Sequence, residues 1–152
     1  MTKNMADFFD IETSISNIWF LLNDKEKEIV KADARIVTYK KNEVIYNEGE
    51  SPLDLMCLLK GKVKIYKNVV GGRNQIIRMV RPVQNFGYRA YFADEPYVTN
   101  ASAFEPSVVC LISMSLVERL ASENSKLALF FIKELSVDLG VADERVVSLT
   151  QK

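Results

Sequence analysis

The sequence feature that most constrains the fold is the change in hydrophobic period at Arg35. From there to Ile112, short apolar runs are separated by turn residues at the intervals expected of an all-β barrel or sandwich. In residues 62–66 the alternation puts Val63 and Ile65 on one face and lysines on the other, which is typical of a half-buried antiparallel strand. The pattern predicts strands at residues 36–39, 44–46, 55–59, 62–66, 75–80 and 108–112, with a hairpin turn at Gly71-Gly72.

Before Arg35 the period is helical, and residues 1–30 predict two helical pieces that cover a sheet. The first piece carries its apolar residues at helical spacing: Ile11, Ile15, Ile18, Trp19 and Leu22, with Phe8 and Phe9 just before them. Asn23 followed by Glu26 predicts a capping-box start for the second piece, residues 24–30.

The composition excludes several classes of protein function. With 152 residues the chain is long enough to form one self-supporting domain. It has no histidine, so a His-rich zinc or iron site, His-ligated haem and a Ser-His-Asp or Cys-His nucleophile cannot be built. Cys57 and Cys110 lie in apolar runs, where buried reduced thiols are expected, and two thiolates alone cannot hold an iron–sulfur cluster. We therefore expect no enzyme activity, no metal and no cofactor.

The charge balance and the hydropathy limit the partners and the location. The 20 basic and 20 acidic residues give a net charge of zero, which disfavours a grip on nucleic acid through net charge. Any DNA contact is expected to belong to another domain. The sequence has no long apolar run and no signal peptide, so we expect a cytoplasmic protein without a membrane partner.

The candidate site is the stretch from Phe86 to Ala103, in which a glycine turn and a proline turn enclose short apolar pieces. The turn at Gly87 is expected to point successive backbone amides at one place, and Pro96 to open a second wall. Tyrosine hydroxyls, one arginine and neutral polar groups would then meet there. The candidate ligand-binding residues are Phe86, Gly87, Tyr88, Arg89, Ala90, Tyr97, Thr99 and Asn100. The alternative is an ordinary β-turn with surface tyrosines.

Residues 125–152 predict one long helix, because they contain no proline and only Gly140 interrupts good helix formers. Apolar residues recur in steps of four and three, as in a coiled-coil seam. This seam, the predicted dimer interface, consists of Ala128, Ile132, Leu135, Leu139, Ala142, Val146 and Leu149. A second apolar row is expected to pack on the chain's own sheets: Leu127, Phe130, Phe131, Val137 and Val141. Two apolar faces require two partners, which favours a homodimer over a monomer with one broad buried face.

The dimer register stays open at this point. Asp138 and Asp143 are expected at positions flanking the seam, where they would repel each other across a parallel dimer. After Leu149 the chain has neither a capping glycine nor a proline, so the helix is expected to be cut rather than ended.

Four segments carry a family resemblance: KKNEVIYNEGE, LMCLLKGKVKIY, RNQIIRMV and FGYRAYFADEPYVTNASA. Together they resemble the double-stranded β-helix of the cyclic-nucleotide-binding superfamily, and most of all the effector domain of Crp/Fnr-type bacterial transcription regulators. The similarity extends from about Ala34 to the end of the chain. Asn42 replaces a glycine common in the family, which the fold tolerates because asparagine adopts left-handed turn conformations readily.

Two further departures from the family bear on the ligand. Members that bind cyclic nucleotides have a glutamate directly after the turn glycine and an arginine directly after the proline, where this chain has Tyr88 and Tyr97. A phenol provides neither a carboxylate nor a fork of charged donors. Loss of a charge-assisted pair to a phosphate costs about 1.5–3 kcal/mol, so a cyclic nucleotide is disfavoured. Arg89 could substitute, but in an extended segment it faces away from its neighbour Tyr88.

The resemblance implies a mainly β fold with flanking helices, a double-stranded β-helix (jelly roll) with a long C-terminal dimerisation helix. Residues 1–33 are expected to cover the roll, 34–114 to form it, and 115–152 to supply the C-terminal helices. The expected function is effector sensing and dimerisation in a transcription regulator whose ligand is not a cyclic nucleotide. The alternatives are a genuine cyclic-nucleotide receptor and a structural dimerisation domain with a filled pocket. In such regulators a helix-turn-helix domain follows the long helix, so this chain is expected to be a fragment or a shortened regulator.

Overall fold

The computed structural model describes residues 10–150, with side chains described up to residue 147. Eight strands form two four-stranded antiparallel sheets, as the resemblance to a jelly roll predicts. The strands are β1 (Arg35–Tyr39), β2 (Val44–Tyr46), β3 (Asp54–Lys60), β4 (Val63–Val69), β5 (Arg73–Val80), β6 (Asn85–Phe86), β7 (Asn100–Ala103) and β8 (Ser107–Ser113). One sheet has the order β1-β8-β3-β6 and the other the order β2-β7-β4-β5.

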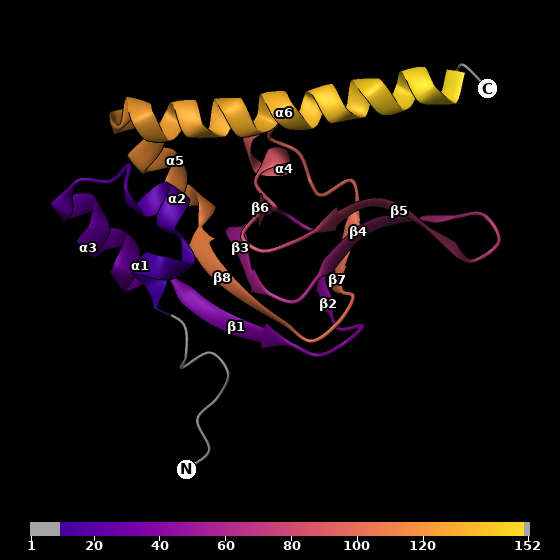
Figure 1. Ribbon diagram of the computed structural model, residues 1–152, viewed down its shortest axis with the longest axis horizontal. Coiled ribbons are helices and arrows are strands. Elements are labelled where there is room, and N and C mark those ends of the chain that lie inside the picture. The colour runs from indigo at the N-terminus through magenta and orange to yellow at the C-terminus, as the bar shows by residue number, and fades with distance from the viewer. Residues whose placement is uncertain (1–9, 151–152) are drawn as a thin grey trace, which may run out of the picture.

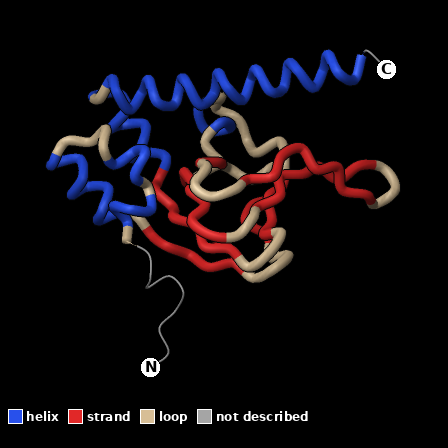
Figure 2. The backbone as a smooth tube through the Cα atoms, in the orientation of Figure 1, coloured by secondary structure: helices blue, strands red, loops and turns tan. Residues whose placement is uncertain are grey.

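The helices gather at one end of the roll and along one of its sides (Figures 1 and 2). They are α1 (Ile11–Ser14), α2 (Ser16–Trp19), α3 (Asp24–Asp33), α4 (Arg89–Phe92), α5 (Met114–Glu123) and α6 (Ser125–Thr150). Helix α6 runs along the length of the molecule, from the end that carries α5 to the side on which the β4–β5 hairpin projects (Figure 1). No helix within residues 10–150 is long and apolar enough to cross a membrane.

The central strands β3 and β8 are apolar along almost their whole length because both of their faces are buried. In β3, Leu55 and Cys57 face the helices, whereas Met56 and Leu58 face the second sheet. The same alternation in β8 divides its side chains between the two cores. The molecule therefore has one core between a sheet and the helices and another between the two sheets.

The N-terminal helices differ from the sequence prediction at Ile15 and at the end of α3, which continues to Asp33 rather than ending at residue 30. The first piece is not continuous, because Ile15 leaves the helical conformation (φ −117°, ψ 35°) and separates two single turns. Ile15 is fully buried in the core between helices and sheet. The capping box at the start of α3 is confirmed: the Glu26 amide donates to Asn23 over 2.8 Å, and the Asn23 amide donates to Glu26 over 2.9 Å. Phe8 and Phe9 lie outside the described residues.

Asn124 joins the start of α6 to the N-terminal helices. Its side chain accepts hydrogen bonds from the first-turn amides of Lys126 and Leu127 at 3.1 and 3.2 Å. The amide group of the same side chain donates to the Leu21 carbonyl over 2.8 Å and to the Glu26 carboxylate over 3.0 Å. The long helix therefore starts from a point that is held by α3 and by the turn that precedes it.

Two short elements in the stretch from Phe86 to Ala103 were not predicted. Helix α4 has no side-chain cap, and β7 is composed of the weak strand formers Asn100, Ala101, Ser102 and Ala103. Strand β7 forms because it lies between β2 and β4, where all four of its residues are buried. Tertiary packing, rather than local propensity, sets both elements.

Candidate functional site

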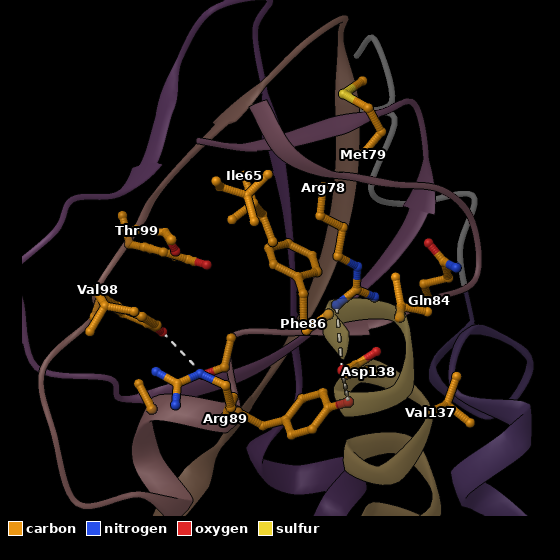
Figure 3. Close-up of a pocket in the computed structure, with 18 of the residues that line it drawn as sticks. Ile65, Arg78, Met79, Gln84, Phe86, Arg89, Val98, Thr99, Val137 and Asp138 are labelled. Atoms are coloured by element: carbon orange, nitrogen blue, oxygen red, sulfur yellow. Dashed lines mark hydrogen bonds and ion pairs between the residues drawn. The ribbon is translucent and has the colours of Figure 1, made fainter. Parts of the chain in front are cut away.

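A cavity of about 460 Å³ lies between the roll and helix α6 (Figure 3). Strands β2, β4, β5 and β6, helix α4 and the segment before β7 form its roll side. The roll side is lined by Tyr46, Ile65, Ile77, Arg78, Met79, Gln84, Phe86, Gly87, Tyr88, Arg89, Ala90, Tyr97, Val98 and Thr99. Helix α6 contributes Val137, Asp138, Val141, Ala142 and Arg145.

Gly87, directly after β6, is part of the cavity lining. Gly87 has a φ of +84°, and a Cβ atom there would meet the Asp54 carbonyl and the Tyr97 hydroxyl at 3.3 Å. The position therefore requires glycine. The Tyr97 hydroxyl donates to the Gly87 carbonyl over 3.3 Å and so joins the two predicted walls of the site.

Tyr97 also forms an aromatic wall with Tyr46. Their rings are parallel to within 9°, with centroids 3.7 Å apart. Burial raises the pKa of both phenols above the ordinary value, and a hydrogen bond with Thr99 opposes part of that shift at Tyr46. Both rings are therefore neutral at physiological pH, and they give the cavity a flat apolar surface with hydroxyl edges.

Tyr88 lies almost fully inside the molecule, with 2% of its surface exposed. Its ring packs at 5.5 Å from the Phe131 ring of α6, and its hydroxyl donates to Oδ2 of Asp138 over 3.4 Å. Burial, and next the negative charge of Asp138, raise the pKa of Tyr88. The tyrosine therefore contacts α6 both through its ring and through its hydroxyl.

Asp138 faces the roll, and its expected place beside a dimer seam stays a prediction. Its Oδ2 lies 3.8 Å from Nη1 of Arg78 on β5, and the two side chains lie next to each other in the lining of the cavity (Figure 3). Nη2 of Arg78 also donates to the Asn85 carbonyl over 3.4 Å. Sequence reasoning missed this pair, because it joins residues 60 positions apart on elements whose relative rotation no local pattern records. One signal was available in the sequence: Asp138 comes directly after Val137, and Val137 belongs to the row that was predicted to face the roll.

Seven of the eight candidate ligand-binding residues line the cavity, and Asn100 does not. Asn100 is buried in β7, where its side chain accepts a hydrogen bond from the Glu48 amide at 2.8 Å. Arg89 lines the cavity but is half exposed and forms an ion pair with Glu95 at 2.6 Å. Its guanidinium is directed away from Arg78 and Asp138 (Figure 3).

The predicted dimer residues divide into three groups. Ile132, Leu139 and Val146 are more than half exposed and lie at seven-residue spacing on one face of α6. Leu135 packs partly against the chain's own core, Ala128 is partly buried, and Ala142 lines the cavity. The side chain of Leu149 lies outside the described residues.

The second apolar row of α6 also divides. Leu127 and Phe131 are buried in the core, as predicted, and Phe130 packs beside them. Val137 and Val141 border the cavity and stay exposed, so only the first part of the row packs on the roll. Among the residues that the structure describes, no group of three or more cysteine, aspartate or glutamate side chains is placed to hold a metal ion.

Comparison with known proteins places this geometry in a family. Residues 36–124 match the family model of the cyclic nucleotide-binding domain. The sensor domain of the transcriptional regulator DNR from Pseudomonas aeruginosa superimposes with a TM-score of 0.75 and 25% identity, over 84% of this chain and 87% of that one. The Anaerobic regulatory protein of Haemophilus influenzae is 24% identical over 92% of this chain and 55% of its own length.

A human kinase shares the same domain. The cGMP-dependent protein kinase 2 of Homo sapiens is 31% identical over 100 residues, which are 65% of this chain and 13% of the kinase. The chain thus spans about half the length of the Haemophilus regulator and a small part of the kinase. The similar structures are sensor domains of regulators, and the kinase match is confined to the cyclic nucleotide-binding domain. The chain belongs to the cyclic nucleotide-binding domain family, and its structural neighbours are the sensor domains of Crp/Fnr-type transcription regulators.

Proposed function

We propose that the chain is the effector-sensing and dimerisation module of a cytoplasmic Crp/Fnr-type transcription regulator, with a ligand other than a cyclic nucleotide. In this proposal residues 1–33 cover the roll, residues 34–114 form it, and residues 115–152 supply the dimer helix. The ligand occupies the cavity between the roll and α6. DNA is contacted through a helix-turn-helix domain and not through residues 10–150.

The observation that carries the proposal is the character of the cavity. About 460 Å³ stays open beside Tyr88 and Tyr97, a volume within the range of small-molecule sites. These tyrosines occupy the positions at which cyclic-nucleotide-binding members have a glutamate and an arginine. The Tyr97 hydroxyl is bonded to the Gly87 carbonyl, and the Tyr88 ring packs on Phe131, so neither side chain provides a charged contact for a ribose or a phosphate.

Dimerisation through α6 supports a sensing role. Ile132, Leu139 and Val146 form an exposed apolar row that does not line the cavity. A ligand beneath the helix would bias its position, and a second copy on the other face would pass that bias to its partner.

A genuine cyclic-nucleotide receptor is the second candidate, because a cGMP-dependent kinase is 31% identical to this chain over 100 residues. In that case Arg89 would have to leave Glu95 and bind the phosphate. A purely structural domain is the third candidate, and the open cavity weighs against it.

Calorimetric titration with cyclic AMP and cyclic GMP tests the proposal. We expect no saturable heat at millimolar nucleotide, since both charged contacts are missing. Saturable binding that Arg89→Gln abolishes would establish the receptor instead, and Lys133→Gln, on the outside of α6, is the matched control for loss of a positive charge.

A further inference from the structure

The cavity contains a cation that is poorly satisfied. Within residues 10–150, the Arg78 guanidinium has one hydrogen bond, to the Asn85 carbonyl at 3.4 Å, and its ion-pair distance to Asp138 is 3.8 Å. A guanidinium has five N–H donors and forms its strongest pairs with a carboxylate at about 2.7–2.9 Å, often through two parallel bonds. The side chain is 30% exposed, so a ligand in the cavity can reach the unused donors.

The other two arginines of the cavity have different partners. Arg89 is held by Glu95 at 2.6 Å, and its guanidinium points away from Arg78 (Figure 3). Arg145 donates to the Ile77 carbonyl on β5. Arg78 is therefore the arginine of the lining that is best placed to bind an anion from inside the cavity.

The charged residues in the cavity lining indicate which ligand charge the cavity would favour. The charged lining residues are three arginines and one aspartate, and Glu95 neutralises Arg89. Arg78 and Asp138 balance each other, so the charge of Arg145 is left over. A net charge of one positive unit fits a ligand with a single negative charge better than a phosphate dianion.

The uncharged residues of the lining indicate that the rest of the ligand is apolar. Ile65 and Phe86 border the cavity from the roll, Val137 and Val141 border it from α6, and the Tyr97 ring forms a flat wall. Surfaces of this kind bind apolar chains and rings, while a few polar groups fix the orientation.

From these observations we infer that the cavity binds an organic monocarboxylate with an apolar body, whose carboxylate pairs with Arg78 in place of Asp138. The inference rests on the proposed sensing function and names its ligand class. Asp138 is 39% exposed at its side chain, so water can solvate it after the exchange. Because Asp138 is on α6 and Arg78 on β5, the exchange removes a contact between the helix and the roll. Ligand binding would thereby change how α6 is held.

Calorimetric titration of the 152-residue chain tests the inference with three carboxylates, benzoate, phenylacetate and hexanoate, and with their neutral amides. We expect at least one carboxylate to bind, and its amide to bind at least about tenfold more weakly, because a charge-assisted pair is lost. Arg78→Gln should weaken carboxylate binding by a similar factor. Asp138→Asn should strengthen it, because a competing anion is removed, and a purely structural role of Asp138 does not predict that gain. Lys133→Gln, which removes a positive charge from the outside of α6 and away from the cavity lining, is the control and should leave the affinity unchanged.

The possible failures are distinguishable. Equal affinity for a carboxylate and its amide, or full affinity in folded Arg78→Gln, would overturn the inference and leave the sensing function standing. Absence of binding by all three carboxylates at millimolar concentration would also overturn it. Saturable binding of cyclic AMP or cyclic GMP would instead contradict the proposed function itself. Circular dichroism of each variant establishes that it is folded before it is titrated.

Discussion

The two halves of helix α6 have similar hydrophobic patterns but different surroundings. In the first half, Leu127 and Phe131 are 2% and 3% exposed and belong to the core between helices and sheet. In the second half, Leu139 is 63% exposed and Val146 is 58% exposed. That half is joined to the roll by the Asp138–Arg78 pair and by the bond from Arg145 to the Ile77 carbonyl.

This difference indicates that one helix has two roles. The first half is held by buried apolar side chains, and exposing them would cost the folded domain several kcal/mol of stability, on the order of the cost of a large-to-small core substitution. The second half is held by exposed polar contacts above a cavity, and each such contact contributes little to stability. A ligand or a second copy can therefore move the second half without unfolding the first.

The largest expected effect is a difference in the free energy of unfolding between a substitution in the first half of α6 and one in the second half. Phe131 packs against the rings of Tyr88, Phe92 and Phe130 at 5.4–5.6 Å, so Phe131→Ala should lower the free energy of unfolding by about 3–5 kcal/mol. Leu139→Ala, at an exposed position, should change it by no more than about 0.5 kcal/mol at protein concentrations where the chain is monomeric. Urea denaturation followed by circular dichroism measures both values. Equal losses in the two variants would contradict the division of the helix.

The sequence predicted the first half of α6 better than the second, and the reason is physical. Helical periodicity identifies which residues share a face, and Leu127 and Phe131 pack as that face predicts. Periodicity does not record what lies opposite the face. Val137 continues the same row but borders a cavity, so it stays exposed.

The same limit applies to the roll and to the site. Strands with strong patterns, such as β3 and β8, were predicted to within one residue at each end. Both strands consist almost entirely of apolar residues, because both of their faces are buried. Strand β7 and helix α4 were missed, because only their neighbours stabilise them. The Tyr88 and Tyr97 positions followed from the glycine and proline turns. The Arg78–Asp138 pair depends on how helix α6 is rotated about its axis above the sheet. The number of residues between the two positions in the sequence does not determine that rotation.

A second, smaller effect concerns self-association. On the proposed dimer, Leu139→Asp places a charge in the apolar row of the second half and should raise the dimer dissociation constant at least about tenfold, because an unpaired charge must be buried. Lys133→Asp changes the charge of the same helix away from that row and should leave the constant nearly unchanged. Sedimentation velocity over a range of concentrations measures both variants. A monomeric wild-type chain at high micromolar concentration, or a dimer unaffected by Leu139→Asp, would show that this row is not the interface.

The smallest effect is expected at Tyr88, the side chain that contacts both halves of α6. Its ring packs on Phe131, and its hydroxyl donates to Asp138 over 3.4 Å, so Tyr88→Phe keeps the contact with the first half and removes the contact with the second. The bond is long and Asp138 is partly exposed, so the loss should be about 0.5–1 kcal/mol at neutral pH.

The pH dependence of that loss gives the sharper test. Burial and Asp138 raise the pKa of folded Tyr88 above the value of 10.0 that it has when unfolded, so the folded state keeps this proton more firmly. The corresponding stability is fully present below pH 10 and is lost as the pH rises beyond 10. Wild type should therefore lose stability in alkali more steeply than Tyr88→Phe, and Asp138→Asn should lie between them, because it removes the second cause of the shift and leaves burial. Urea titrations from neutral to alkaline pH measure the three slopes. Equal slopes in wild type and Tyr88→Phe would mean that the Tyr88 hydroxyl is solvated rather than held between the roll and the second half of α6.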